Sequence, residues 1–402
     1  MRILWVKAGK LLPVDTGGKI RSYNILRHLS RQHELTLLSY YGGTRDHAYE
    51  AAIVEHLPRA QTIYTAAPEG TVHQSFDYIW NLTSRAPYAV KKFTHPDVQR
   101  TVASGLSQKQ FDVAICDFLS ASLNFPDRLE LPCVLFQHNV ESVLWRRMAE
   151  SETNPVRKLS YSIEASKMVR YEKGALRKFH QVIAVSQQDR EEMLKLDSAC
   201  RITVVPTGVD TEQYQVAPSA SGDPPRVVFT GSMDWEPNID AMEYFCQQIW
   251  PTVLNNFPEA RFQIVGRNPS PRVRRLGSAS VEVTGKVASI VDYVAPATLV
   301  VVPLRIGGGT RLKIFEAMAM GKAVVSTSIG AEGLDVTDGR DVLIADSPDK
   351  FASSILELLR NPELRRKYEK AGASLAARYD WSEISSAFGD VLQECVNRFR
   401  KA

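Results

Sequence analysis

The amino-acid sequence predicts an α/β protein with two domains, each a parallel sheet covered on both faces by helices. Three observations lead to this fold class. The chain has 402 residues, which is more than one small core accommodates. Short apolar runs alternate with helix-period stretches, as they do when crossover helices join parallel strands. The alternation is interrupted once, by a segment rich in Pro, Gly and Ser over 206–225, and it then restarts.

We therefore expect an N-terminal domain over 1–205, a linker over 206–225 and a C-terminal domain over 226–380. The last stretch, 381–402, has the pattern of a helix, and we expect it to cross back and pack on the first domain. Ligands of parallel sheets bind beyond the carboxyl ends of the strands. Because neither half holds a complete cofactor fingerprint, we expect the ligand site in the cleft between the two halves.

The first half opens like a Rossmann domain. An apolar strand over 2–6 is followed by a loop with Gly17 and Gly18, and then by a helical pattern that begins at Ile20. The glycine spacing does not match the dinucleotide fingerprint, so NAD binding is not indicated. Gly17 and Gly18 form either a plain turn or a backbone site for an anion at the helix start. Further strands are expected over 34–38, 60–64, 113–116, 133–136 and 182–185.

Two polar residues of this half, Asp117 and His138, come directly after predicted strands. Because the carboxyl ends of parallel strands meet at one edge of a sheet, we expect both side chains to face the crevice. They are candidate catalytic residues. A single histidine after a strand is more often structural, so the structural role stays open for His138.

A long amphipathic helix is expected over 155–179. Its basic residues cluster opposite the apolar face, and we expect no acidic partner among them. This basic face is either a solvated surface or a contact for anionic lipid or a phosphorylated acceptor. The basic residues are Lys167, Arg170, Lys173, Arg177 and Lys178.

The second half repeats the strand and helix alternation and contains a glycine-rich loop. An apolar run over 299–302 leads through Gly307, Gly308 and Gly309 into a helix that opens at Thr310. Backbone amides and the helix dipole at such a start favour an anion, and phosphate is the expected one. Glu316 lies nearly two turns further on, where a carboxylate suits ribose hydroxyls. The alternative is an ordinary turn followed by a solvated glutamate.

The composition bounds the class of protein. Apolar residues make up 44% and charged residues 23%, as in ordinary globular proteins. A net charge of +4 is too small for a dedicated nucleic-acid binder. The five cysteines show no Cys-x-x-Cys pattern, which favours reduced thiols. No signal-peptide core or membrane-spanning run is present, so we expect a cytoplasmic protein.

The second half resembles the nucleotide-sugar-binding domain of retaining glycosyltransferases with the GT-B fold, in which two Rossmann-like domains face each other across a cleft. The first half resembles this family more loosely, through Gly17, Gly18 and the block 137–141. In the second half the order and spacing of the matching blocks cover about residues 200–380. These blocks are 206–210, 229–231, 264–266, 285–287, 302–303 and 315–325.

The resemblance implies a donor site for a nucleoside diphosphate sugar, with no further cofactor. In it Glu316 holds the nucleotide ribose, and the amides of Gly309, Thr310 and Arg311 meet the diphosphate. Backbone groups of 285–287 line the base pocket. The implied donor-binding residues are Gly17, Gly18, Gly231, Gly285, Lys286, Val287, Gly308, Gly309, Thr310, Arg311, Lys313 and Glu316.

The sequence departs from the family pattern at three places. Gly308 stands where the family often has a second glutamate, which removes the usual partner of a donor-sugar hydroxyl. No basic pair follows the Gly231 turn, so Arg311 and Lys313 are the nearest sources of positive charge. Asp117 stands where many members carry a histidine. His138 is then the better candidate at the reaction centre.

The resemblance implies a retaining glycosyltransferase that moves a sugar from a nucleoside diphosphate sugar to a hydroxyl acceptor, such as a glycan, a lipid-linked sugar or a small metabolite. We expect no metal, because the chain has no Asp-x-Asp pair and no His/Cys cluster at ligand spacing. The helix over 155–179 makes peripheral contact with the inner face of a membrane in this interpretation. Two alternatives remain, a nucleotide-sugar epimerase on the same plan and a non-catalytic nucleotide-sugar-binding protein.

Overall fold

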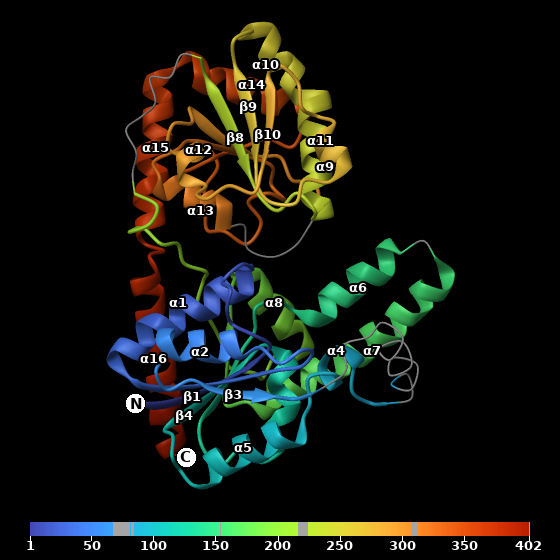
Figure 1. Cartoon of the computed structure of the whole chain (residues 1–402), viewed down its shortest axis with the longest axis vertical. Coiled ribbons are helices and arrows are strands. Elements are labelled where there is room, and N and C mark those ends of the chain that lie inside the picture. The colour runs from blue at the N-terminus through green and yellow to red at the C-terminus, as the bar shows by residue number, and fades with distance from the viewer. Residues whose placement is uncertain (67–80, 82–83, 153, 216–223, 307–311, 402) are drawn as a thin grey trace. The chain divides into compact units, whose positions relative to one another are not determined.

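The structure is a computed structural model that describes residues 1–66, 81, 84–152, 154–215, 224–306 and 312–401. The chain folds into two compact units. The first comprises 1–206 and 382–402, and the second comprises 207–381. Each unit contains one parallel sheet with helices around it (Figure 1). The predicted α/β fold class is therefore confirmed, and each unit is described by itself below.

The first unit is built on a seven-stranded sheet with the order β3-β2-β1-β4-β5-β6-β7. All neighbouring strands pair in parallel. In this order the chain steps outward from β1 in both directions, so the carboxyl ends of β1 and β4 lie side by side at the switch point, where such sheets bind ligands. The strands are β1 (Arg2–Ala8), β2 (Glu34–Tyr41), β3 (Gln61–Tyr64), β4 (Val113–Asp117), β5 (Cys133–Phe136), β6 (Gln181–Ala184) and β7 (Ile202–Val204).

Helices cover both faces of this sheet. Leu4 and Val6 of β1 point into a core shared with α5, and α1 and α2 lie on the other face (Figure 1). The helical elements are α1 (Gly17–Gln32), α2 (His47–His56), α4 (Tyr88–Lys91), α5 (Pro96–Ser107), the 3₁₀ helix η1 (Leu119–Asn124), α6 (Glu141–Ser151), α7 (Pro155–Lys178), α8 (Gln187–Leu196) and α16 (Trp381–Lys401).

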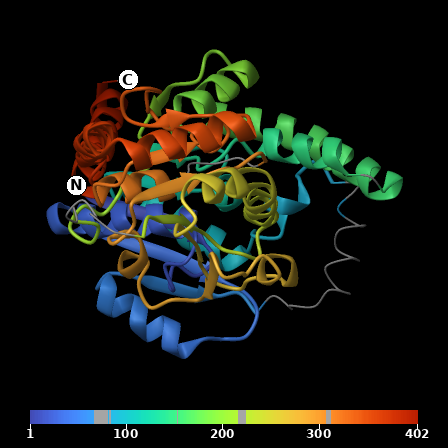
Figure 2. The same ribbon diagram turned by 90° about the horizontal axis from the view of Figure 1, so that it is seen from above.

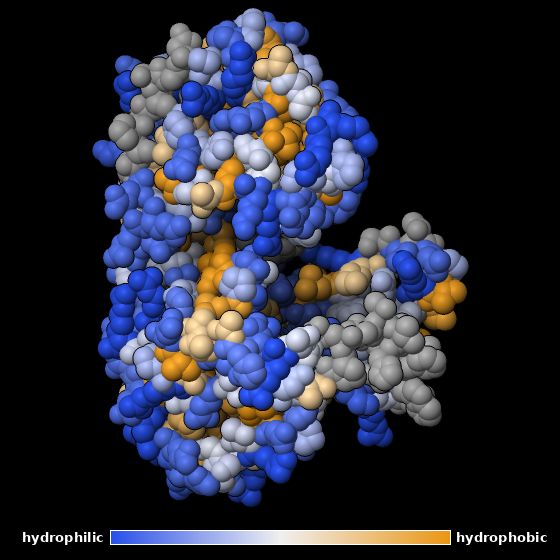
Figure 3. Space-filling view, viewed as in Figure 1, coloured by the Kyte–Doolittle hydropathy of each residue, from blue (hydrophilic) through white to orange (hydrophobic). Residues whose placement is uncertain are grey.

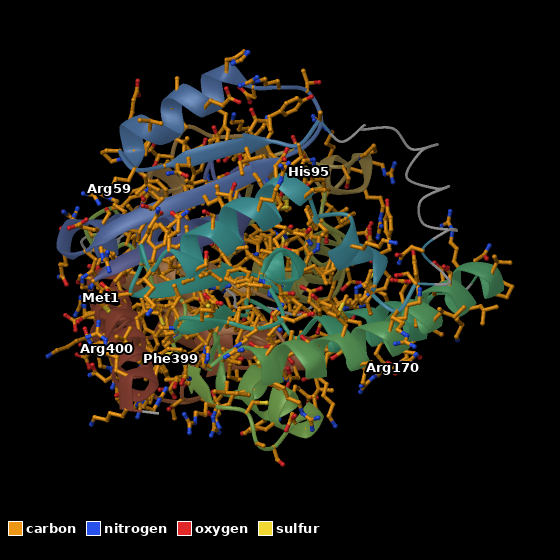
Figure 4. The ribbon with its side chains drawn as sticks, turned by 90° about the horizontal axis from the view of Figure 1, so that it is seen from below. Met1, Arg59, His95, Arg170, Phe399 and Arg400 are labelled. Atoms are coloured by element: carbon orange, nitrogen blue, oxygen red, sulfur yellow. The ribbon has the colours of Figure 1, made fainter. Side chains whose placement is uncertain are left out.

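The C-terminal helix α16 returns to the first unit, as predicted. Phe388 stacks on Trp5 with ring centroids 5.5 Å apart and meets the edge of Phe136 at 5.0 Å. Arg400 also approaches the carboxylate of Asp112 at 3.7 Å, on the side of the unit where Figure 4 labels Met1 and Phe399. The buried aromatic contacts attach α16 to the sheet, because they remove large apolar surfaces from water.

Helices α6 and α7 form an antiparallel hairpin that extends away from the sheet of this unit (Figures 1 and 2). The buried carboxylate of Glu172 on α7 accepts hydrogen bonds from the backbone N–H groups of Glu141 and Ser142, each at 3.0 Å. These are unsatisfied donors at the start of α6, so Glu172 caps that helix from outside. Trp145 and Tyr161 pack edge to face further along the hairpin.

The second unit contains a six-stranded parallel sheet with the order β10-β9-β8-β11-β12-β13. Its strands are β8 (Arg226–Thr230), β9 (Arg261–Val265), β10 (Val281–Gly285), β11 (Leu299–Val302), β12 (Val324–Ser326) and β13 (Leu343–Ile344). Its helices are α9 (Glu236–Tyr244), the π-helical turn η2 (Phe245–Ile249), α10 (Trp250–Asn256), α11 (Pro271–Arg274), α12 (Val291–Val294), α13 (Leu312–Ala319), α14 (Pro348–Arg360) and α15 (Pro362–Ala377).

The first part of the predicted linker is packed on the second unit instead of spanning free between two domains. Val209 donates its N–H to the carbonyl of Tyr379 at 2.8 Å, and Thr211 bonds to the carboxylate of Asp380. A side chain on Gly208 would meet the ring of Trp381 at 2.6 Å. Glycine is therefore needed here for close packing, although the same composition is typical of a linker.

None of the helices in the described residues combines the length and the hydrophobicity that a membrane-spanning segment needs.

Candidate functional site

A cavity of about 1100 Å³ opens in the first unit where β1 and β2 end. Gly18, at the start of α1, lies against the ring of Phe118, and a Cβ on this glycine would come within 2.6 Å of that ring. Gly18 and Phe118 both line the cavity, so the glycine is required for the α1 terminus to approach it this closely. Other lining residues include Lys7, Lys10, Lys19, Tyr41, Asn81, Tyr88, Lys91, Lys92, Phe93, Thr94 and His95.

A buried polar cluster lies next to this cavity and is centred on Asp117. Its Oδ2 accepts hydrogen bonds from Lys7 Nζ at 2.9 Å, Ser22 Oγ at 2.7 Å and Trp5 Nε1 at 3.0 Å. Its Oδ1 accepts one from His138 Nε2 at 2.8 Å. Burial works against the charged form, but Lys7, His138 and the hydrogen bonds together hold the pKa of Asp117 below its usual range.

His138 is fully engaged in this cluster. Arg21 Nη1 lies 2.9 Å from Nδ1, and a guanidinium only donates, so Nδ1 accepts and the ring proton is on Nε2. Burial lowers the pKa of His138 to about 3, although Asp117 acts in the opposite direction. The histidine is therefore neutral at pH 7, and both ring nitrogens are occupied by protein groups.

Asp117 and His138 are brought together, but neither lines the cavity. The ring of Phe118 stacks on the His138 imidazole with centroids 3.7 Å apart, and the same ring lines the cavity. In this structure Phe118, and not Asp117 or His138, contributes to the cavity wall. Phe118 has φ of 71°, a left-handed conformation that a bulky residue rarely adopts. The catalytic roles of Asp117 and His138 stay predictions.

In the second unit, the predicted donor residues Gly231 and Lys313 lie together. Lys313 Nζ is 3.2 Å from Asn238 Oδ1 and 4.0 Å from the ring centroid of Phe229. A Cβ on Gly231 would lie 3.0 Å from this amine and 2.8 Å from Asn238 Nδ2. The family's basic pair is missing after this turn, and Lys313 brings a positive charge to the same place from α13.

Glu316 lies one helical turn beyond Lys313 and is partly buried. The hydroxyl of Tyr214 donates to Glu316 Oε1 at 3.5 Å. Burial raises the pKa of Glu316, while Lys313 and Tyr214 partly oppose this shift. The contact with Tyr214 is long for a hydrogen bond, so among the described residues Glu316 retains acceptor capacity for ligand hydroxyls.

The remaining predicted donor residues are placed as follows. Gly285 ends β10 with φ of 73°, a conformation that favours glycine, and it lies at the same carboxyl edge of the sheet as Gly231. Lys286 is exposed, and Val287 packs against the core of the unit. Gly17 begins α1 in the first unit and is exposed. Gly308, Gly309, Thr310 and Arg311 lie outside the described residues.

Asn238 and Tyr214 were not predicted from the sequence as site residues. Asn238 is only 3% exposed and connects Lys313 to the carbonyl of Ser232. A polar side chain near the start of α9 indicates a site residue only when the structure shows that this face of the helix is buried. Tyr214 reaches Glu316 across 102 residues of sequence, and no local pattern indicates that contact.

The predicted basic face of α7 is wrong for Lys167 and Lys178, which are not exposed, and Arg177 is exposed but has an acidic partner. Lys167 is 6% exposed and donates to Glu164 at 3.0 Å. Arg177 forms an ion pair with Asp197. Lys178 donates to the carbonyl of Phe125 at 2.8 Å. Arg170 and Lys173 are exposed, so no continuous unpaired arc of five charges exists on this helix.

Two family models match the chain. The model for glycosyltransferase family 4 matches residues 16–213, and the model for glycosyl transferases group 1 matches residues 224–361. Together they cover most of both units. Their boundary falls close to the division between the units at Pro206 and Thr207.

Known proteins resemble the chain in sequence and in fold. A phosphatidyl-myo-inositol mannosyltransferase of Mycobacterium leprae is 30% identical over 227 residues, which cover 53% of this chain and 60% of that protein. The chain thus spans less than two thirds of this curated relative. Sucrose-phosphate synthase of Thermosynechococcus elongatus has a TM-score of 0.72 at 16% identity over both full chains. Anabaena HepE, solved with UDP-glucose, has a TM-score of 0.65 at 16% identity, with 98% of this chain and all of that one covered.

The structural likenesses show the fold, and the two family models assign its halves to the same group of enzymes. On this basis, the chain belongs to the GT-B glycosyltransferase family.

Proposed function

We propose that this protein is a retaining glycosyltransferase that moves a sugar from a nucleoside diphosphate sugar to a hydroxyl acceptor. The acceptor is a glycan, a glycolipid or a small metabolite in cell-surface polysaccharide or glycoconjugate synthesis. The observation that carries this proposal is the pairing of a positive charge and a weakly engaged carboxylate on α13, Lys313 and Glu316. Both follow the loop where the sequence predicts a phosphate site.

The roles of these residues follow from the charges that develop in the reaction. When the bond between sugar and diphosphate breaks, negative charge builds on the β-phosphate and the sugar becomes oxocarbenium-like. Lys313, held by Asn238 and the ring of Phe229, supplies positive charge at the Gly231 turn. Removing one such group costs on the order of 3 kcal/mol of transition-state stabilisation. Glu316 accepts hydrogen bonds from the ribose hydroxyls in this proposal.

The donor is a nucleoside diphosphate sugar, and the solved complex of Anabaena HepE with UDP-glucose supports this class. We propose that no metal ion takes part, because the sequence holds no Asp-x-Asp pair. Positive side chains then take over the neutralisation of the diphosphate.

We further propose that the hairpin of α6 and α7 docks on an anionic membrane, at the inner face of the cell membrane. Three large apolar side chains of α7 are exposed: Val156 by 76%, Leu159 by 64% and Ile163 by 37%. Their spacing places them on one stripe of the helix. Exposed Arg157 and Lys158 flank the stripe. Figure 3 shows apolar surface on this hairpin.

An anionic membrane fits this surface better than a soluble partner. Apolar side chains enter the headgroup boundary while Lys and Arg meet anionic lipids. The mannosyltransferase relative is named for a phosphatidyl-inositol acceptor, which is consistent with a lipid-linked substrate. We therefore propose that α7 contacts the membrane through the apolar stripe near its start, and not through the basic face predicted from the sequence.

The function is tested in two steps. A thermal-shift screen against UDP-, GDP-, ADP- and dTDP-linked sugars identifies the donor, since ligand at about 100 times its Kd adds roughly 2.7 kcal/mol of stability. Transfer from that donor to an acceptor extract is then followed by mass spectrometry, and the anomeric configuration of the product by NMR. A product with the donor's configuration supports retention.

Two other results would contradict the proposed transferase activity and identify a different function. Release of a free epimerised nucleotide sugar without acceptor identifies an epimerase. Tight donor binding without turnover on any acceptor identifies a binding protein.

A further inference from the structure

We propose that the cavity of the first unit binds the acceptor through an anionic group, a phosphate or a carboxylate, that the acceptor sugar carries. This inference rests on the proposed function and names the chemical class of its acceptor. It concerns the cavity of about 1100 Å³ at the ends of β1 and β2.

The charges of the cavity wall have one sign. Among the lining residues that the structure describes, none is Asp or Glu. Five lysines and one histidine line the same space: Lys7, Lys10, Lys19, Lys91, Lys92 and His95. Figure 4 labels His95, the N-cap residue of α5. A wall of this kind concentrates anions, because low-dielectric surroundings focus the field of the lysines.

Three of these lysines are already neutralised by carboxylates outside the cavity. Lys7 pairs with Asp117 at 2.9 Å. Lys10 pairs with Asp46 at 2.8 Å, and Lys19 pairs with Asp15 at 3.0 Å.

Lys91 and Lys92 differ from the other three lysines of the cavity, because neither forms an ion pair with any described residue. Lys92 does act electrostatically on Glu141, a carboxyl whose pKa is raised to about 7 by burial and by Glu172. At pH 7 that carboxyl is only partly ionised, so it compensates Lys92 incompletely. The two adjacent lysines therefore retain positive charge for an anionic ligand.

The segment that carries these lysines is fixed in place. The buried carboxylate of Glu164 accepts from the N–H of Tyr88 at 2.8 Å, which holds the start of α4. Asn124 donates to the carbonyl of Phe93 at 3.0 Å and accepts from the N–H of His95 at 3.0 Å. Both ends of the segment from Tyr88 to His95 are thus held by buried polar side chains of other elements. A fixed segment loses less conformational entropy when it binds a ligand.

Two buried polar atoms of this wall have no hydrogen-bond partner among the described residues. They are Thr94 Oγ1 and Asn81 Oδ1, and the Asn81 residue is only 2% exposed. A buried polar atom without a partner is costly, and such atoms often mark a ligand or water position. The threonine hydroxyl donates to an anionic oxygen, while the amide oxygen accepts from a sugar hydroxyl. Together, the two groups offer a hydrogen-bond donor to the anionic group of the ligand and an acceptor to its hydroxyls.

Helix α1 points its N-terminus at the same space. Thr16, Gly18 and Lys19 line the cavity, and α1 runs for 16 residues from Gly17. Its first N–H groups and its dipole favour an anion there. Aromatic rings of Tyr41 and Phe118 provide apolar wall for a sugar face.

The test measures binding of small probes by isothermal titration calorimetry. Glucose 6-phosphate and glucuronate carry the anion on a soluble sugar, octyl phosphate carries it on a single alkyl chain, and glucose is the neutral reference. All titrations are run with the donor site saturated by the nucleoside diphosphate found in the donor screen. We expect an anionic probe to bind more tightly than glucose, and the preferred probe distinguishes phosphate from carboxylate and soluble from lipid-linked sources.

The variants are Lys91→Gln with Lys92→Gln, and separately Thr94→Val. Each lysine contributes a charge-assisted hydrogen bond to the anionic probe. The loss of one lysine therefore weakens binding of that probe about tenfold. Glucose binding and nucleotide binding remain unchanged. The matched control is Lys367→Gln, an exposed lysine of the second unit, which leaves all probes unaffected.

Equal affinity for glucose and for all three anionic probes overturns the inference, as does undiminished anion binding by the double lysine variant. Either result leaves the glycosyltransferase proposal intact if the nucleotide sugar still binds and turns over. Failure of donor binding and turnover in the unmodified protein removes the proposed function instead.

Discussion

His138 Nε2 donates to Asp117 Oδ1 over 2.8 Å, and both residues are almost fully buried in the first unit. The contact joins the last residue of β4 to the second residue after β5. Lys7 lies beside Asp117 in the sheet register and supplies the balancing charge. A buried carboxylate is tolerated because all four of its hydrogen bonds come from protein donors. Two predictions follow from this geometry.

Asp117→Asn is expected to destabilise the fold by roughly 3–5 kcal/mol, because it leaves the buried Lys7 ammonium without a counter-charge. The measurement is urea unfolding followed by circular dichroism. Asp112→Asn is the matched control, since Asp112 is partly exposed and pairs with Arg2 at 3.2 Å. The control is expected to lose only about 1 kcal/mol. Equal losses in the two variants would contradict the role of the buried charge.

The second prediction concerns stability at acid pH. Burial lowers the folded-state pKa of His138 to about 3, whereas an unfolded histidine titrates near 6.5. Between these values the unfolded chain binds the extra proton, so stability falls as the pH drops from about 6.5 towards 3. The slope from this one residue is at most about 1.4 kcal/mol per pH unit.

His138→Asn keeps a neutral hydrogen-bonding side chain without a titration in this range. Urea unfolding at pH 6.5, 5.5 and 4.5 is expected to show a smaller acid loss for this variant. Glu141, whose folded pKa is raised to about 7, acts in the opposite direction in both proteins and cancels in the comparison. Identical pH slopes for parent and variant would mean that His138 is not buried in neutral form.

Most strands of the two sheets were predictable from the sequence because they are continuous apolar runs. The exceptions have local causes. Strand β1 extends to Ala8 instead of ending near residue 6, since the charge of Lys7 is satisfied inside the protein by Asp117. Strand β13 has only two residues and pairs only with β12, so no periodicity indicates it.

The candidate site was predictable only where its residues lie close in the sequence. Glu316 and Lys313 share one helix. The glycine-rich loop before it predicts Glu316, and the missing basic pair of the family pattern points to Lys313. The contact of Lys313 with Asn238 spans 75 residues and joins a side chain of α13 to one of α9, which no local pattern indicates. Likewise, helical periodicity places Lys167 on a face of α7 but does not show that it is buried with Glu164 and the carbonyl of Asn81 as partners.

Glu316→Gln is expected to weaken binding of the nucleotide donor by roughly 10- to 100-fold, because a charge-assisted hydrogen bond to a hydroxyl is worth about 1.5–3 kcal/mol. The change preserves shape, so the melting temperature should remain close to that of the parent. Calorimetric titration with the donor found in the thermal-shift screen measures the effect. Glu282→Gln, at an exposed position on β10, serves as control. Parent-like donor affinity in Glu316→Gln would exclude the ribose role.

Turnover is expected to continue in the presence of excess EDTA. The proposed reaction neutralises the departing diphosphate with side chains such as Lys313, which chelation leaves unchanged. Initial rates are compared before and after dialysis against EDTA, and again after adding Mg²⁺ or Mn²⁺. A rate that vanishes on chelation and returns with either metal would show that the diphosphate is neutralised by a metal ion.

Sedimentation with liposomes tests the apolar stripe on α7. The parent protein is expected to sediment with vesicles that contain anionic lipid, and less so at high salt, because Arg157 and Lys158 contribute about 1 kcal/mol each near such a surface. Leu159→Asp with Ile163→Asp should abolish sedimentation by placing charges where apolar side chains enter the headgroup region. Both positions are exposed, so the fold is expected to survive.

Val54→Asp is the matched control for this experiment, since Val54 is 44% exposed on α2, outside the hairpin. It is expected to sediment like the parent. The hairpin variant should also lose activity on a lipid-borne acceptor in vesicles while it still glycosylates a soluble one, because the proposed donor residues Lys313 and Glu316 lie on α13, outside the hairpin. If the hairpin variant instead self-associates less than the parent in ultracentrifugation and binds vesicles normally, the stripe is a contact between two copies of the chain, and the membrane proposal is wrong.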